Sequence, residues 1–134
     1  MIEAFKRRDL HGYLELMDPE LEFIPYEVHL EGGDPYRGHA GVRRWWEELF
    51  AVVPDVRADV FEIRDFGSRT VVHGRLHGQG AASGAPIDRT MWLVTEWRGD
   101  KEVWWGSFVS EDEALEAVSR SELRRATLQD ASDI

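Results

Sequence analysis

Two residues whose side chains could take part in chemistry, Arg75 and His77, lie two positions apart in a β-rich segment. Alternation along a strand places both side chains on one face, about 7 Å apart. A fixed guanidinium can hold a ligand oxygen or a developing oxyanion, and a histidine near a carboxylate can act as a base at neutral pH. We therefore expect His77 to be the base and Arg75 the electrostatic stabiliser. The alternatives are a salt-bridged arginine and a polar histidine without chemistry.

The neighbours of this pair are predicted from hairpin pairing. Four strands are predicted, joined by turns at Gly67-Ser68, at AASGAP and at Gly99-Asp100: residues 56–66, 70–80, 87–98 and 101–109. Directly opposite residues share a sheet face. Two-residue turns then place on one face Val60, Glu62, His73, Arg75, His77, Asp88, Thr90, Trp92, Val94, Trp105 and Ser107. Glu62 and Asp88 are the expected partners of Arg75.

Helices and one further strand precede and follow these four strands. The expected elements are a short helix within residues 1–8, a helix capped by Asp9, a strand over 20–26, a loop over 28–39, a helix over 41–53 and a last helix after Ser110. This order predicts an α+β fold with the helices on one face of the sheet.

Length and charge limit the class of protein. The 134 residues predict one domain over 1–125, followed by a flexible tail over 126–134. A net charge of −10 argues against nucleic acid and anionic lipid as partners. No apolar run approaches a membrane span of about 18 residues, so a cytoplasmic location is expected. The chain has no cysteine, and His73 and His77 are about 13 Å apart, so we expect no metal site and no cofactor.

Four stretches of the sequence are similar to SnoaL-like proteins of the NTF2-like superfamily. They read AFKRRDLHGYLELMDPELEF, GHAGVRRWWEELF, DFGSRTVVHGRLHGQGAASG and WRGDKEVWWGSFVSEDEALEAV. The resemblance implies a cone, in which a strongly curved antiparallel sheet wraps around the N-terminal helices and encloses a pocket. Relatives in the superfamily include polyketide cyclases, steroid isomerases, epoxide hydrolases and dehydratases, while others only bind ligands or proteins.

The resemblance also implies which face lines the pocket. Limonene-epoxide-hydrolase-like relatives carry an Arg-x-Asp pair and a second Asp, which fall on Arg75, His77 and Ser107. The polar face is therefore expected to line the pocket, together with Trp46 and Tyr26. Two of the expected carboxylates are replaced here, so the hydrolase set is incomplete. The other face would meet water, which predicts a homodimer through Met91, Leu93, Trp104 and Phe108.

Two classes of function remain open on the sequence alone. One is a cofactor-free enzyme of the cyclase, isomerase or hydrolase type that acts on a small apolar or aromatic compound, polyketide-like or terpenoid-like. The other is a non-catalytic ligand-binding or dimeric interaction module, which the missing carboxylate at Ser107 favours.

Overall fold

One curved, six-stranded sheet organises the chain. The computed structural model describes residues 2–24, 35–81, 84 and 86–119. The strand order is β2-β1-β6-β5-β4-β3; β1 runs parallel to β6 and all other neighbours are antiparallel. The strands are β1 (Met17–Ile24), β2 (Tyr36–Arg37), β3 (Arg57–Asp65), β4 (Arg69–Gln79), β5 (Pro86–Arg98) and β6 (Lys101–Phe108).

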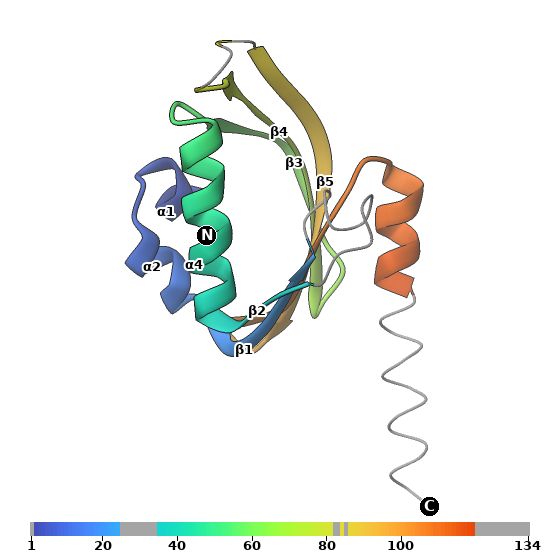
Figure 1. Ribbon diagram of the computed structural model, residues 1–134. Helices are drawn as coiled ribbons and strands as arrows, with labels where there is room; N and C mark the ends of the chain where they lie inside the picture. Colours follow the sequence, from blue (N-terminus) through green and yellow to red (C-terminus); the bar gives the residue numbers. More distant parts are fainter. Residues whose placement is uncertain (1, 25–34, 82–83, 85, 120–134) are drawn as a thin grey trace, which may run out of the picture.

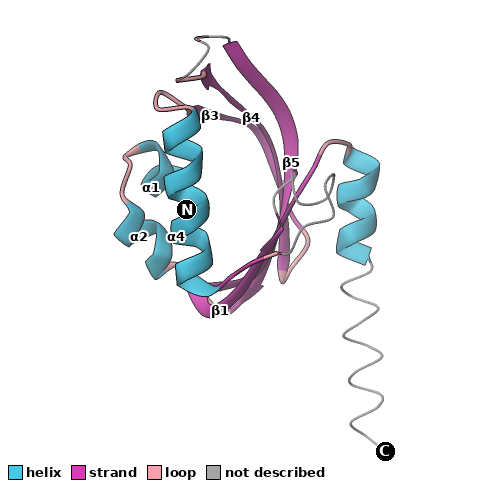
Figure 2. Cartoon of the chain, viewed as in Figure 1, coloured by secondary structure: helices cyan, strands magenta, loops and turns pink. Residues whose placement is uncertain are grey.

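Helices cover both faces of this sheet. The concave face curves around α1 (Ile2–Lys6), α2 (Leu10–Glu15) and α4 (Gly38–Val52), whereas a last helix over 111–119 lies against the convex face (Figures 1 and 2). The expectation that all helices share one face is therefore wrong for the last helix. The predicted tail over 126–134 lies outside the described residues, and no described helix is long and apolar enough to cross a membrane.

Capping side chains fix two helix starts at the expected residues. Asp9 Oδ1 accepts a hydrogen bond from the Gly12 amide at 3.0 Å, which opens α2. Ser110 Oγ accepts one from the Glu113 amide at 3.2 Å, which opens helix 111–119. Each cap satisfies a backbone donor that has no carbonyl partner in the first helical turn.

Apolar side chains fill two separate cores, one on each side of the sheet. The larger core lies on the concave side, where the Trp46 ring on α4 meets Phe5 at 5.5 Å and Tyr13 at 5.0 Å between ring centroids. The smaller core lies between the sheet and helix 111–119. The sheet contributes Val71, Val94 and Phe108, and the helix contributes Ala114, Ala117 and Val118. The core to which an apolar strand residue belongs therefore shows which face of the sheet its side chain lies on.

Two β-bulges shift the strand registers from those expected. The β4–β5 pair is regular and places Arg75 opposite Thr90 and His77 opposite Asp88. This register differs from the expected one by two residues, which keeps every side chain on its expected face. The β3–β4 pair contains a bulge between Val60 and Glu62, and the β5–β6 pair contains another between Glu96 and Trp97. A bulge adds one residue to one strand and reverses the facing of the residues beyond it.

Candidate functional site

The structure divides the sequence-predicted site residues between the two sides of the sheet. Trp46, Trp105 and Ser107 face the concave side; Ser107 pairs with Leu93 and its Oγ lies 3.6 Å from Met91 Sδ. Tyr26 lies outside the described residues. The remaining residues lie on the convex side: Glu62, His73, Arg75, His77, Asp88, Thr90, Trp92 and Val94.

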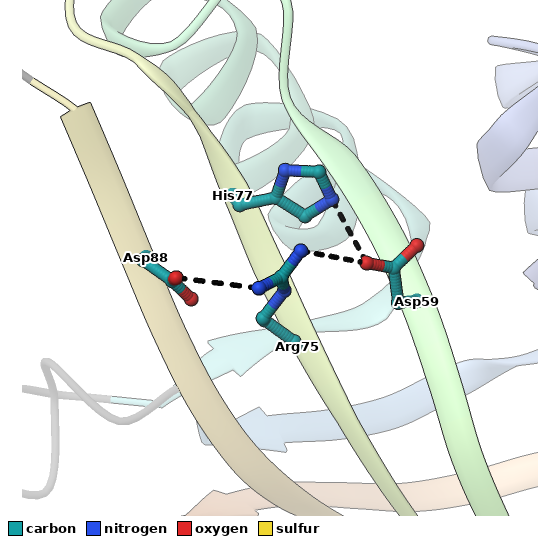
Figure 3. Close-up of polar contacts among 4 residues, drawn as sticks. All are labelled: Asp59, Arg75, His77 and Asp88. Carbon is teal, nitrogen blue, oxygen red and sulfur yellow. Dashed lines mark hydrogen bonds and ion pairs between the residues drawn. The ribbon is translucent and has the colours of Figure 1, made fainter.

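The predicted catalytic pair belongs to an ionic cluster on the convex face. Arg75 Nη2 lies 3.1 Å from Asp59 Oδ2, and Arg75 Nη1 lies 3.4 Å from Asp88 Oδ2 (Figure 3). His77 Nε2 lies 3.0 Å from the same Asp59 oxygen. The side chains of Arg75 and Asp59 are 36% and 46% exposed. All four side chains are partly exposed, so each ion pair stabilises the fold by at most about 1 kcal/mol, although Arg75 Nε and His77 Nε2 are themselves buried without a hydrogen bond from a described residue.

The face of this cluster is settled by its neighbours along β4. Val71 lies two residues from His73 and four from Arg75, hence on the same side, and it packs in the core of helix 111–119. Leu76, which points the other way, packs against the α4 core. The expectation that the polar face lines the layer between sheet and α4 is therefore wrong. Strand alternation shows which residues share a face but not which face meets α4, and the choice between the two faces was made from the family resemblance.

The predicted dimer patch does not form a single surface. Met91 and Leu93 face the concave side, whereas Trp104 and Phe108 pack on the convex side beneath helix 111–119. The bulge between Glu96 and Trp97 separates the two pairs, because it turns every β6 residue after it to the other face. Gly106 makes room for this packing: a Cβ there would lie 2.6 Å from the Trp104 ring.

The same bulge places two β6 residues with polar side-chain atoms, Glu102 and Trp105, between the concave face of the sheet and the helices. This region is called the concave layer. Glu102 pairs with Trp97, and Trp105 pairs with Thr95, so one extra residue separates them. Without the bulge, a spacing of three would place Glu102 and Trp105 on opposite faces. With it, Glu102 lies buried near Tyr13 of the large core, and Trp105 stacks on Phe23 at 3.9 Å within that core.

Several polar atoms of this concave layer are buried without a hydrogen-bond partner among the described residues. Glu102 is 0% exposed, Thr95 1% and Trp105 5%. Within the described part of the chain, no hydrogen bond reaches Thr95 Oγ1, Trp105 Nε1 or either Glu102 carboxyl oxygen. Unpaired polar groups are costly to bury, typically by about 1–3 kcal/mol each. They are the groups of this layer that a bound molecule would satisfy.

The electrostatics of the layer single out Glu102. Burial removes water from its carboxyl group and raises its pKa from 4.5 to about 8. Burial also raises the pKa of the Tyr13 hydroxyl well above its usual value, and the Glu102 charge adds to that rise. A carboxyl group with a pKa near neutrality can both donate and accept a proton at physiological pH.

Apolar side chains beside these polar atoms are partly open to solvent. They face the concave side and pack against the large core, yet each is only partly buried: Trp45, Leu49, Leu76, Ile87 and Leu93. Trp45 meets Trp105 edge to face at 5.4 Å, so this apolar wall continues to the buried polar atoms. These five side chains are therefore the partly exposed apolar neighbours of the buried polar atoms.

Sequence reasoning missed Glu102, Thr95, Tyr13 and Asp59. Asp59 was missed because the bulge at Phe61 moves it opposite Arg75, where Val60 was expected. Glu102 had a visible signal, since it is the one carboxylate inside the apolar stretch EVWWGSF. Among the described residues, no group of three His, Cys, Asp or Glu side chains could hold a metal ion.

A curved six-stranded sheet that wraps around helices places the chain among α+β domains, and a family model narrows that class. The SnoaL-like domain model matches residues 1–105, and the chain belongs to this family. No functionally curated protein matches the sequence.

Three solved structures illustrate the likeness in fold. An NTF2-like protein of unknown function from Burkholderia pseudomallei is 22% identical over 86% of this chain and 88% of its own, with a TM-score of 0.71. TerC, co-crystallised with polyporic acid, is 22% identical over 86% and 89%, with a TM-score of 0.70. IdmH from Streptomyces antibioticus, a candidate polyketide cyclase, is 23% identical over 87% and 90%, with a TM-score of 0.68.

Proposed function

We propose that the chain binds a small apolar or aromatic molecule between α4 and the sheet and catalyses a cofactor-free proton transfer on it. The observation that carries this proposal is Glu102, which is fully buried with neither oxygen hydrogen-bonded by a described residue. A structural role gives no reason to keep such a group, because a neutral side chain of similar size would cost less to bury. Buried groups with a strongly shifted pKa are typical of functional sites.

The proposed reaction uses groups already in the layer. The Glu102 carboxylate takes a proton from a carbon of the bound compound, the C–H bond breaks, and its electron pair stays on the substrate. Protonated Glu102 then returns the proton at the same or another atom, so no oxidant, reductant or metal is needed. Cyclase and isomerase reactions both begin with such a step. The apolar wall at Leu76 and Leu93 suits a polyketide-like or terpenoid-like skeleton.

Hydrogen–deuterium exchange tests the chemistry with a simple aromatic ketone. In D₂O, 2-tetralone exchanges the hydrogens beside its carbonyl group, and proton NMR measures their loss. We expect the protein to accelerate this exchange at least about 100-fold, as positioned acid–base groups do. Glu102→Gln should lose the acceleration, while Glu47→Gln, an identical change on an exposed position of α4, should keep it.

Two results would contradict the proposal. Exchange at the rate of the buffer alone would remove proton transfer as the function. Exchange that survives in Glu102→Gln and disappears in His77→Ala would assign the chemistry to the convex cluster of Asp59, Arg75 and His77 instead.

A non-catalytic second function, dimerisation through the convex face, is favoured by one observation. Phe61 is 55% exposed and its ring meets His73 edge to face at 5.2 Å, beside the Arg75 cluster. A second copy of the chain on this face would cover Phe61 and remove water from His77. Sedimentation equilibrium should then give a dimer for the wild type and a monomer for Phe61→Asp. A monomeric wild type would exclude this function.

A further inference from the structure

A pair of buried hydrogen-bonding groups in the concave layer has no assigned role. Trp105 and Thr95 lie directly opposite each other on β6 and β5, on the concave face. Directly opposite residues of an antiparallel pair bring their Cβ atoms to about 5 Å. Trp105 Nε1 and Thr95 Oγ1 have no hydrogen-bond partner within the described part of the chain, although both residues are more than nine-tenths buried.

The chemistry of the two groups defines what they would bind. An indole N–H can only donate a hydrogen bond, and a threonine hydroxyl can donate one as well. A single ligand oxygen can accept from two donors, as the oxygen of a ketone, an ester or a quinone can. A hydrocarbon would leave both donors unpaired, and a buried unpaired donor is costly.

The surroundings of Trp105 hold its donor in one place. Its ring stacks on Phe23 at 3.9 Å with an interplanar angle of 19°, and Trp45 meets it edge to face at 5.4 Å. A ring fixed on two sides cannot turn its N–H toward solvent. A donor held in this way orients a ligand without a further entropic cost for the side chain.

A second tryptophan of the sheet, Trp97, differs from Trp105 in that its indole N–H has a hydrogen-bond partner. Trp97 lies on β5, two residues from Thr95, and its Nε1 donates to Thr70 Oγ1 at 3.1 Å. The fold therefore satisfies the indole N–H of Trp97 and leaves that of Trp105 without a partner among the described residues.

From these observations we infer that Trp105 Nε1 and Thr95 Oγ1 form a binding site for one carbonyl-type oxygen of the ligand. This inference rests on the proposed concave site, and it adds the ligand class: a flat, largely apolar compound that carries a hydrogen-bond-accepting oxygen. Glu102 lies three residues before Trp105 on the same face, within about 10 Å along β6. The oxygen site therefore orients a carbon near its carbonyl toward the Glu102 end of the layer.

Equilibrium dialysis with two matched probes tests the site. 2-Acetonaphthone carries a carbonyl oxygen, and 2-ethylnaphthalene has the same ring system without it. We expect the wild type to bind the ketone at least about tenfold more tightly than the hydrocarbon. Trp105→Phe keeps the aromatic ring and Thr95→Val keeps the shape, so each should reduce this preference to about threefold or less by removing one donor.

Trp97→Phe is the matched control, because its N–H is already satisfied, and it should keep the full preference. Infrared spectroscopy supplies a second readout, which a purely structural role would not move. The carbonyl stretch of bound 2-acetonaphthone should shift to lower frequency in the wild type and return toward its solution value in Trp105→Phe.

The outcomes separate this inference from the proposed function. Equal binding of both probes, or a preference that survives both donor variants, overturns the oxygen site and leaves the concave pocket in place. Binding of neither probe overturns the pocket and the oxygen site together. Tetralone exchange without a carbonyl preference would retain the proposed proton transfer and reject the oxygen site alone.

Discussion

The Arg75 cluster on the convex side of this sheet and Glu102 on its concave side differ in their access to water and in their partners. On the convex side, Arg75 and His77 both lie within 3.1 Å of one Asp59 oxygen, and all three side chains reach water. On the concave side, Glu102 is fully buried, without a hydrogen bond from a described residue. The cluster with more charges is thus the one that the fold leaves in contact with solvent. Burial without partners, rather than the number of charged residues, identifies the candidate chemical site.

The largest effect we expect is on the pH dependence of stability, and it belongs to Glu102. Its pKa is about 8 when folded and 4.5 when free of the fold. The folded state therefore keeps a proton that the unfolded state releases, and the stabilising contribution present below pH 4.5 is lost as the pH rises through 8. Urea unfolding should show that Glu102→Gln is more stable than the wild type by about 5 kcal/mol at pH 9 and nearly equal at pH 4.

Glu47→Gln gives the comparison for that experiment, since its carboxylate is exposed. It should change stability by less than about 0.5 kcal/mol at either pH. A Glu102→Gln difference that stays constant from pH 4 to pH 9 would mean that this carboxyl group titrates alike in both states.

A smaller loss of stability is expected from Gly106→Ala. The added Cβ would lie 2.6 Å from the Trp104 ring and 3.2 Å from the Phe108 ring, so both must move beneath helix 111–119. Overpacking of this kind costs about 2 kcal/mol, which thermal unfolding would register as a lower Tm. Because the change lies on the convex side, tetralone exchange at the concave site should persist at a temperature where the variant is folded. A loss of exchange in the folded variant would show that the two sides are not independent.

The smallest effect should come from the convex cluster. Asp59→Asn removes the carboxylate that both Arg75 and His77 contact, yet all three side chains are partly exposed. We expect a loss of no more than about 1 kcal/mol in urea unfolding, and a still smaller loss at high salt concentration. A loss above about 3 kcal/mol would mark the cluster as a buried network and weaken the contrast between the two sides.

Local sequence signals predicted most of the elements, because capping residues, prolines and glycine turns act over a few positions. They missed β2 (Tyr36–Arg37), which lies within the expected loop over 28–39. Asp9 and Ser110 cap the expected helices, and Arg98 pairs with Lys101 across the expected Gly99-Asp100 turn. The register of β4 against β5 differs from the expected one by an even number of residues, so Arg75, His77 and Trp92 share a face as predicted.

Local sequence signals could not predict which face of the sheet each candidate site residue lies on. Each bulge inserts one residue without a clear mark in the sequence, and that residue reverses the strand beyond it. The bulge near Glu96 moves Trp105 and Ser107 to the concave side, and the one at Phe61 brings Asp59 to Arg75. Which face meets α4 depends on the docking of helix 111–119, a contact between distant parts of the chain. The bulges and this docking together decide which residues line the candidate site.

The most direct test is whether Glu102 holds its proton at neutral pH inside the concave layer. Carbon-13 NMR of protein labelled at the glutamate carboxyl carbons measures this, with Glu102→Gln to assign the resonance. We predict one glutamate resonance that titrates near pH 8 in the wild type and is absent from the variant. A Glu102 resonance that titrates below about pH 5, as an unperturbed glutamate does, would contradict the assignment of Glu102 as the proton-transfer group.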